Sequence, residues 1–202
     1  MTSQLLLELT PPPAPTLENF VVGANRAAID ALAAAASGRA VGAIYLWGER
    51  GTGKTHLLAA LQCAGVAAID DVDQLAAPAQ LEAFDLFNRT RVAGGSVIAA
   101  GVAPPACLGG LREDLRSRVL SGLTFQLHPL SDGEKAAALA AHAAERGMKL
   151  PPEAIDHLLA RLPRGLGTQF AVLDAIDRYS LALKRPVTLP LVREALRALD
   201  LA

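Results

Sequence analysis

The chain has 202 residues, 19 basic and 20 acidic side chains and a formal net charge of −1; 51% of its residues are hydrophobic and only 4% are aromatic. This length can bury a core without disulfides or metals, and the near-neutral charge argues against a generally basic, nucleic-acid-binding surface. The two cysteines, Cys63 and Cys107, fit no metal or disulfide pattern, so we expect a cytoplasmic protein.

The first segment, residues 1–16, is expected to be a flexible tail. It carries an apolar stretch followed by four prolines between Thr10 and Pro15, which favour an extended spacer. No basic region precedes the apolar stretch, and no other run in the sequence is suited to cross a bilayer. We therefore expect neither a signal peptide nor a membrane segment.

Residues 17–128 alternate short apolar strands with helices. We expect strands at 43–47, 66–70, 96–100 and 123–127, and helices at 25–36, 53–63, 79–92 and 111–120. This alternation predicts an α/β domain with a parallel sheet of about four strands.

Residues 129–202 carry helix signals only. Ser131 and Glu134 form a capping box before a helix that ends near residue 146, and Pro152 opens a second helix. Thr168 is expected to cap a third helix, and Thr188 precedes a fourth. The sequence therefore predicts a small helical domain after the α/β domain.

A phosphate-binding loop is the most specific motif in the chain. Residues 48–55, Gly-Glu-Arg-Gly-Thr-Gly-Lys-Thr, fit G-x-x-x-x-G-K-[ST] without a mismatch, between an expected strand and an expected helix. Gly48, Gly51 and Gly53 let backbone N–H groups converge on a phosphate. Lys54 is expected to reach the β- and γ-phosphates, and the Thr55 hydroxyl to ligate Mg²⁺.

Two carboxylates end the next expected strand. Asp70 stands where phosphate-loop proteins hold the hydration shell of Mg²⁺, and Asp71 where they orient the attacking water. Many ATPases of this kind carry Glu at the second position. Because Asp is one methylene shorter, we expect it to position the water less well.

These motifs, in this order, resemble the DnaA and Hda family of AAA+ proteins. The resemblance covers nearly the whole chain, and its segments are residues 17–25, 48–56, 69–71, 84–89, 115–118, 130–135 and 164–166.

The resemblance implies further site residues. Phe20, Val21, Thr52 and His56 join the loop glycines and Lys54 around the nucleotide, although His56 also fits a plain helix surface.

Two arginines receive roles from the same resemblance. Arg164 matches the sensor 2 arginine of the helical lid, and Arg118 matches the arginine finger, which acts on a neighbour's nucleotide. Both also fit ordinary surface positions.

The tail is similar to the segment with which Hda binds the DNA polymerase sliding clamp. Gln4 can hydrogen-bond at a pocket rim, while Leu5, Leu7 and Leu9 can fill an apolar cleft. Packing of the tail on its own domain is the alternative. The chain has no room for the DNA-binding domain of DnaA, so we expect no sequence-specific DNA binding.

Two features depart from the family pattern. Only 14 residues separate Thr55 from Asp70, which predicts the loss of one edge strand with its crossover. The sensor 1 strand ends in Ala100-Gly-Val-Ala-Pro-Pro105 and brings no polar side chain to the attacking water. We therefore expect weak intrinsic ATP hydrolysis.

The favoured function is a nucleotide-bound adaptor on the DNA-loaded clamp, and so near the nucleoid, that stimulates ATP hydrolysis by DnaA and negatively regulates replication initiation. An autonomous AAA+ ATPase, such as a helicase loader, and a degenerate assembly platform are the alternatives. The choice between ADP and ATP, and self-association, stay open.

Overall fold

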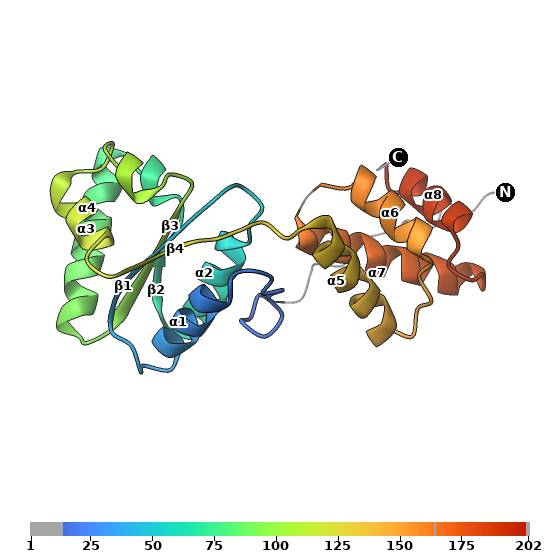
Figure 1. Cartoon of the computed structure of the whole chain (residues 1–202), viewed down its shortest axis with the longest axis horizontal. Coiled ribbons are helices and arrows are strands. Elements are labelled where there is room, and N and C mark those ends of the chain that lie inside the picture. Colours follow the sequence, from blue (N-terminus) through green and yellow to red (C-terminus); the bar gives the residue numbers. More distant parts are fainter. Residues whose placement is uncertain (1–13, 164, 201–202) are drawn as a thin grey trace. The chain divides into compact units, whose positions relative to one another are not determined.

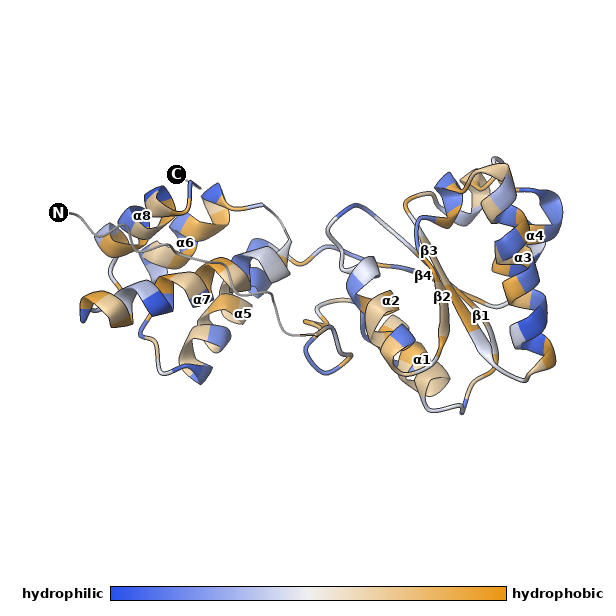
Figure 2. Ribbon diagram, turned by 180° about the vertical axis from the view of Figure 1, so that it is seen from behind, coloured by the Kyte–Doolittle hydropathy of each residue, from blue (hydrophilic) through white to orange (hydrophobic). Residues whose placement is uncertain are grey.

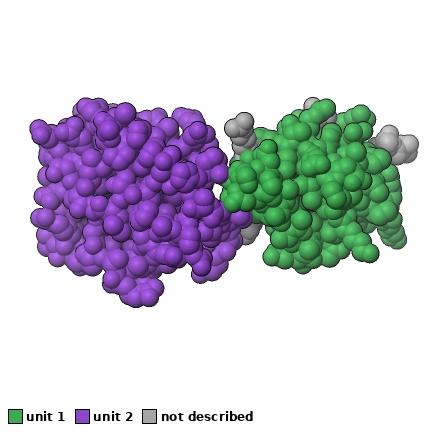
Figure 3. Space-filling view, in the orientation of Figure 1, with its two compact units in different colours: residues 1–13, 130–202 green, residues 14–129 purple. Residues whose placement is uncertain are grey.

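The computed structural model describes residues 14–163 and 165–200. They fall into two compact units, residues 14–129 and residues 130–200, which Figure 3 colours separately. Each unit is described by itself. Among the described helices, none has the length and apolar character needed to cross a membrane.

The first unit alternates strands and helices (Figure 1). Its elements are α1 (Arg26–Ala36), β1 (Gly42–Trp47), α2 (Lys54–Cys63), β2 (Ala67–Ile69), the 3-10 turn η1 (Val72–Gln74), α3 (Ala77–Val92), β3 (Ser96–Gly101), the 3-10 turn η2 (Pro105–Cys107), α4 (Glu113–Val119) and β4 (Leu123–Gln126).

The four strands form one parallel sheet in the order β2-β3-β1-β4. This confirms the predicted parallel four-stranded sheet. β1 and β3 are central and mostly buried, whereas the shorter β2 and β4 lie at the edges and are more exposed. Because β2 is an edge, the strand that leads to Asp70 has hydrogen-bonded neighbours on one side only.

Two apolar layers cover the faces of the sheet. α1 and α2 lie on one face, where Leu32, Leu57 and Leu61 pack against Ile44 and Ile98. α3 and α4 lie on the other face and bury a second cluster, which includes Tyr45, Phe87, Leu115 and Val119. In Figure 2 the sheet is mostly orange, and polar residues lie on the outer sides of α3 and α4. This two-layer burial fixes the sheet from which the loops of the candidate site project.

The second unit is helical and contains α5 (Asp132–Glu145), α6 (Pro152–Arg161), α7 (Leu166–Leu183) and α8 (Leu189–Ala198). Its core is built from fully buried aliphatic side chains of all four helices, among them Leu139, Leu158, Val172 and Leu191. α8 contributes an apolar stripe at helical spacing, as expected for a helix that covers a core with one face.

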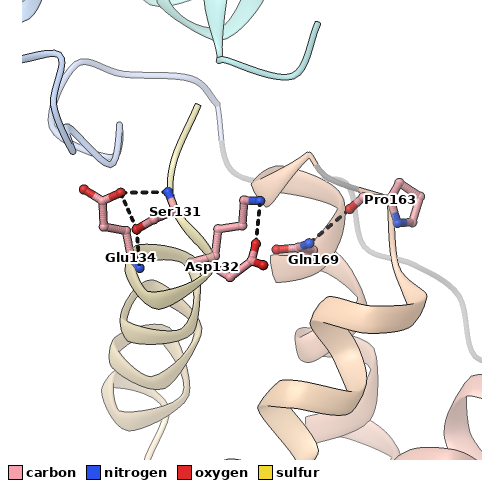
Figure 4. A network of polar contacts seen from close by, with 6 residues as sticks. Ser131, Asp132, Glu134, Pro163 and Gln169 are labelled. Atoms are coloured by element: carbon pink, nitrogen blue, oxygen red, sulfur yellow. Dashed lines mark hydrogen bonds and ion pairs between the residues drawn. The ribbon is translucent and has the colours of Figure 1, made fainter. Parts of the chain in front are cut away.

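Two predictions for helix starts in this unit have different outcomes. The capping box before α5 is confirmed: the Ser131 hydroxyl accepts from Glu134 N at 3.2 Å, and Ser131 N donates to Glu134 Oε2 at 2.8 Å (Figure 4).

The predicted cap at Thr168 is wrong. α7 begins at Leu166 with Gly165 as its N-cap, because the Gln169 N–H already donates to the Gly165 carbonyl. The Gln169 side chain, 1% exposed, also donates to the Pro163 carbonyl (Figure 4).

Candidate functional site

The phosphate loop connects β1 to α2 at the carboxyl end of the sheet. β1 ends at Trp47, and α2 begins at Lys54 with Gly53 as its N-cap at φ 92°. A Cβ at Gly53 would also lie 2.5 Å from Phe20 Cε2, and one at Gly48 would lie 2.4 Å from the Leu127 carbonyl oxygen. Glycine is therefore required at both positions, at Gly53 by φ and by contact.

Lys54 is folded into this loop and is only 7% exposed. Its ammonium donates to the carbonyl oxygens of Gly48 at 2.8 Å and Glu49 at 2.9 Å. Burial lowers the pKa of Lys54 below its ordinary value, and the carboxylates of Asp70 and Asp71 oppose that shift. The residues fit a phosphate group, because an anion could replace the two neutral carbonyls as partner of the buried charge.

The loop is closed further by Thr52, whose hydroxyl donates to the Glu49 carbonyl at 3.0 Å. Gly51 lies between them with φ 85°. Together with the N-terminus of α2, this turned backbone has the form of a phosphate cradle.

The predicted magnesium residues are brought together. Thr55 Oγ1 donates to Asp70 Oδ2 at 2.7 Å, although 15 positions separate the two residues. No group of three or more His, Cys, Asp or Glu side chains within residues 14–163 and 165–200 could hold a metal by itself. The pair therefore suits a cation such as Mg²⁺ that keeps several waters and phosphate oxygens as ligands.

The Asp71 carboxylate takes no part in the Thr55–Asp70 hydrogen bond. Asp71 is exposed and has a left-handed backbone, with φ 44°, and its N–H donates to Asp70 Oδ1 at 2.9 Å. The left-handed turn directs the chain from the end of β2 into η1.

The segment before α1 reaches the start of α2. His56 Nε2 lies 3.0 Å from the Thr16 carbonyl oxygen, and the rings of His56 and Phe20 are 5.7 Å apart between centroids. Phe20 packs against the α1–α2 core cluster, and Val21 is half-buried. Phe20 and His56 therefore lie beside the phosphate loop, where the resemblance expects an adenine.

Arg118 lies in the last turn of α4. It is half-buried, and its Cζ is 5.8 Å from the centroid of the Phe84 ring on α3, a cation–π distance. Its neighbour Arg116 is exposed on the same helix.

Sequence reasoning missed two polar residues that organise this unit. Asn25 is 4% exposed, and its amide donates to the His128 carbonyl and accepts from the His128 N–H. Asp73 holds the backbone of the turn after β3. Position alone could have drawn attention to both residues, because Asn25 precedes an apolar helix and Asp73 follows the acidic pair by two residues.

The remaining predicted site residues lie outside the described part of the chain. These are Arg164 and the tail residues Gln4, Leu5, Leu7 and Leu9.

Two family models match separate parts of the chain. The model of the Hda lid domain matches residues 132–196, and that of the bacterial DnaA ATPase domain matches residues 13–67. An uncharacterized protein of Haemophilus influenzae is 30% identical over 229 residues, covering 97% of this chain and 99% of that protein.

Solved structures with the same fold include two initiator proteins. Domain III of Thermotoga maritima DnaA has a TM-score of 0.71 at 22% identity, covering 95% of this chain and 98% of that one. AMPPCP-bound DnaA from Aquifex aeolicus has a TM-score of 0.65 at 25% identity, covering 84% of this chain and 66% of that one.

Proposed function

Because the chain belongs to the DnaA-related family of AAA+ proteins and has an Hda-type lid, we propose that it is a nucleotide-bound regulatory adaptor. It docks on the DNA-loaded sliding clamp and stimulates ATP hydrolysis by DnaA, which suppresses re-initiation of replication. The observation that carries the proposal is an intact phosphate loop and Thr55–Asp70 pair in a chain whose second unit matches the Hda lid.

The nucleotide in this proposal is ADP or ATP. Its phosphates would be held by the residues that line the turned loop around the buried ammonium. These are Gly48, Gly51, Thr52, Gly53 and Lys54.

The other nucleotide contacts come from flanking segments. Phe20, Val21 and His56 would lie on the base side, Thr55 and Asp70 would hold Mg²⁺, partly through water, and Arg164 would reach from the lid. AMPPCP in the Aquifex DnaA structure supports a nucleotide in this family's fold.

Arg118 is the residue that would act on DnaA. A guanidinium inserted beside another protein's γ-phosphate stabilises the charge that develops there during hydrolysis, an effect of roughly 10³-fold or more. Its half-buried position in the last turn of α4, over an aromatic ring rather than a carboxylate, leaves its charge available to an anion.

The tail would provide localisation. Gln4, Leu5, Leu7 and Leu9 would occupy a pocket of the clamp as an extended peptide, and the proline spacer would raise the local concentration of the rest of the chain. Replacing Gln4 and Leu5 with Ala should abolish clamp capture and leave nucleotide binding unchanged.

Hydrolysis by this protein itself would be slow. The end of β3 and the residue after it, residues 100–102, bring no polar side chain, and Asp71 is a short, exposed carboxylate in the place where the water would be oriented. Rapid ATP turnover by the isolated protein would favour an autonomous ATPase instead.

The test of nucleotide binding is Lys54→Ala. Ligand binding stabilises the native state by mass action, so ADP should raise the melting temperature of the wild type and not that of the variant. An equal rise in both would show that the loop assignment is wrong.

The test of the regulatory function compares Arg118→Ala with the matched control Arg116→Ala. Clamp, DNA and DnaA–ATP are held constant, and phosphate release is measured. Arg118→Ala should lose an order of magnitude or more of the stimulation, because its charge acts in the transition state, and Arg116→Ala should keep it. Equal stimulation by both variants would make Arg118 an ordinary surface residue.

A further inference from the structure

The connection from β3 to α4, residues 102–112, is held at both ends by side chains that come from outside it, and two of these follow the acidic pair in the chain. Asp73 on η1 binds its first turn, and Gln80 on α3 binds its last residues. We propose that Asp73 and Gln80 are positioning residues that fix α4, and with it Arg118, for action on a partner's nucleotide. The inference rests on the proposed function and names a further part of the same machinery.

Asp73 fixes the start of the connection. Its Oδ2 accepts from the N–H groups of Val102 at 3.1 Å and Ala103 at 3.0 Å. The buried Tyr45 hydroxyl donates to the Ala103 carbonyl at 2.6 Å, so side chains hold both polar groups of residue 103.

These side chains fill the space that a side chain at position 101 would occupy. A Cβ on Gly101 would lie 2.5 Å from Asp73 Oδ1 and 2.8 Å from the Tyr45 hydroxyl oxygen. A side chain at position 101 and the present positions of Asp73 and Tyr45 therefore cannot both be accommodated.

Gln80 fixes the end of the connection. It is 7% exposed, and its Nε2 donates to the carbonyls of Leu75 at 2.9 Å and Gly110 at 3.2 Å. Its Oε1 accepts from Arg112 N at 2.8 Å. Arg112 is the N-cap residue of α4, so this contact sets where the helix begins.

The two positioning residues, Asp73 and Gln80, both lie in the chain segment that follows the acidic pair. Asp73 lies two residues after Asp71, and the Gln74 N–H donates to the Asp71 carbonyl, so η1 continues directly from the acidic pair. Asp73 on η1 and Gln80 on α3 hold opposite ends of the connection that leads into α4. Because a displacement of about 1 Å at a reacting centre can cost about 10²-fold in rate, such bracing is relevant to a finger arginine.

The test uses the full-length protein and Gln80→Leu, a change of similar volume that removes three hydrogen bonds, with the exposed Gln74→Leu as matched control. The maximal rate of stimulated DnaA ATP hydrolysis should fall at least tenfold with Gln80→Leu. The concentration giving half-maximal stimulation and the affinity for ADP should change less than twofold. A purely structural role would instead reduce only the melting temperature and leave stimulation per folded molecule intact, which would overturn the inference.

A second measurement does not depend on any variant folding. In wild type, the amides of residues 102, 103 and 112 should exchange with solvent deuterium as slowly as those in the middle of β3. Fast exchange at these amides would show that Asp73 and Gln80 do not hold the connection in place.

Failure of this inference and failure of the proposed function are distinguishable. If Arg118→Ala abolishes stimulation while Gln80→Leu and Asp73→Asn keep it, Arg118 acts as proposed, but Gln80 and Asp73 do not position it. If Arg118→Ala keeps full stimulation, the proposed function is wrong and the positioning role fails with it.

Discussion

Replacing Asn25 with alanine should destabilise the α/β unit, because the Asn25 side chain is hydrogen-bonded to both backbone polar groups of one distant residue, His128. The Asn25 amide donates to the His128 carbonyl at 3.0 Å and accepts from the His128 N–H at 2.8 Å. It makes no capping bond to α1, although it is the N-cap residue of that helix. The loss therefore falls on the junction between the start of α1 and the chain that leaves β4.

The magnitude follows from these two bonds. A buried hydrogen bond contributes about 1 kcal/mol net, and a partner left unsatisfied costs about 1–3 kcal/mol. His128 itself is exposed, so water can reach part of its backbone once the amide is gone. We expect Asn25→Ala to lower the free energy of unfolding by about 2 kcal/mol, a fall of about 4–8 °C in melting temperature.

The Asn25→Asp variant separates the contributions of the two hydrogen bonds, because it keeps one of them and loses the other. The carboxylate can still accept from the His128 N–H, but it cannot donate and instead faces a carbonyl oxygen. It should therefore also be less stable than wild type. Its loss should shrink as pH falls through the range in which a buried carboxyl gains a proton, because the neutral acid can donate again.

Urea unfolding followed by tryptophan fluorescence measures these changes. Trp47 is the only tryptophan, and its carbonyl accepts from Leu127 N at 2.7 Å, beside the affected junction. A loss below about 0.5 kcal/mol for Asn25→Ala, the range of an ordinary surface substitution, would refute the reasoning.

Three further predictions concern other contacts. Gly53→Ala should destabilise the apoprotein and weaken nucleotide binding, and Phe20→Ala in the same chain should recover the part of the loss that is due to the ring, as a double-mutant cycle would measure. Burial and a nearby carboxylate raise the pKa of Tyr45, so the folded state loses stability as pH rises above the ordinary tyrosine pKa of about 10; Tyr45→Phe should remove that slope in alkaline unfolding curves and cost about 1 kcal/mol at neutral pH. Hydrogen bonds from Ser131 lower the pKa of Glu134, so its contribution is present above the ordinary Glu pKa and is lost as pH falls through the lower folded value; acid unfolding curves of Glu134→Gln should lack this component.

The sequence by itself determined the features that depend on neighbouring residues. The phosphate loop, the capping box at Ser131 and the alternation of strands with helices are local patterns, because glycine conformation, capping and apolar periodicity act over a few positions. Compared with the longer interval of the family it resembles, the short interval between Thr55 and Asp70 also predicted a four-stranded sheet, since 14 residues hold one helix and no additional strand with its crossover.

Only the tertiary structure decided which polar side chains hold distant backbone. Asn25 meets His128 across 103 positions, and Gln80 meets Arg112 across 32. No local signal specifies such partners, because they are chosen by which loops the sheet brings together. The start of α7 also differs from the local signal: Thr168 suits a cap, but the helix begins at Leu166, with Gln169 bonded to the chain before it. Local chemistry selected the elements, and the packing of the sheet and helices selected the contacts that position the site.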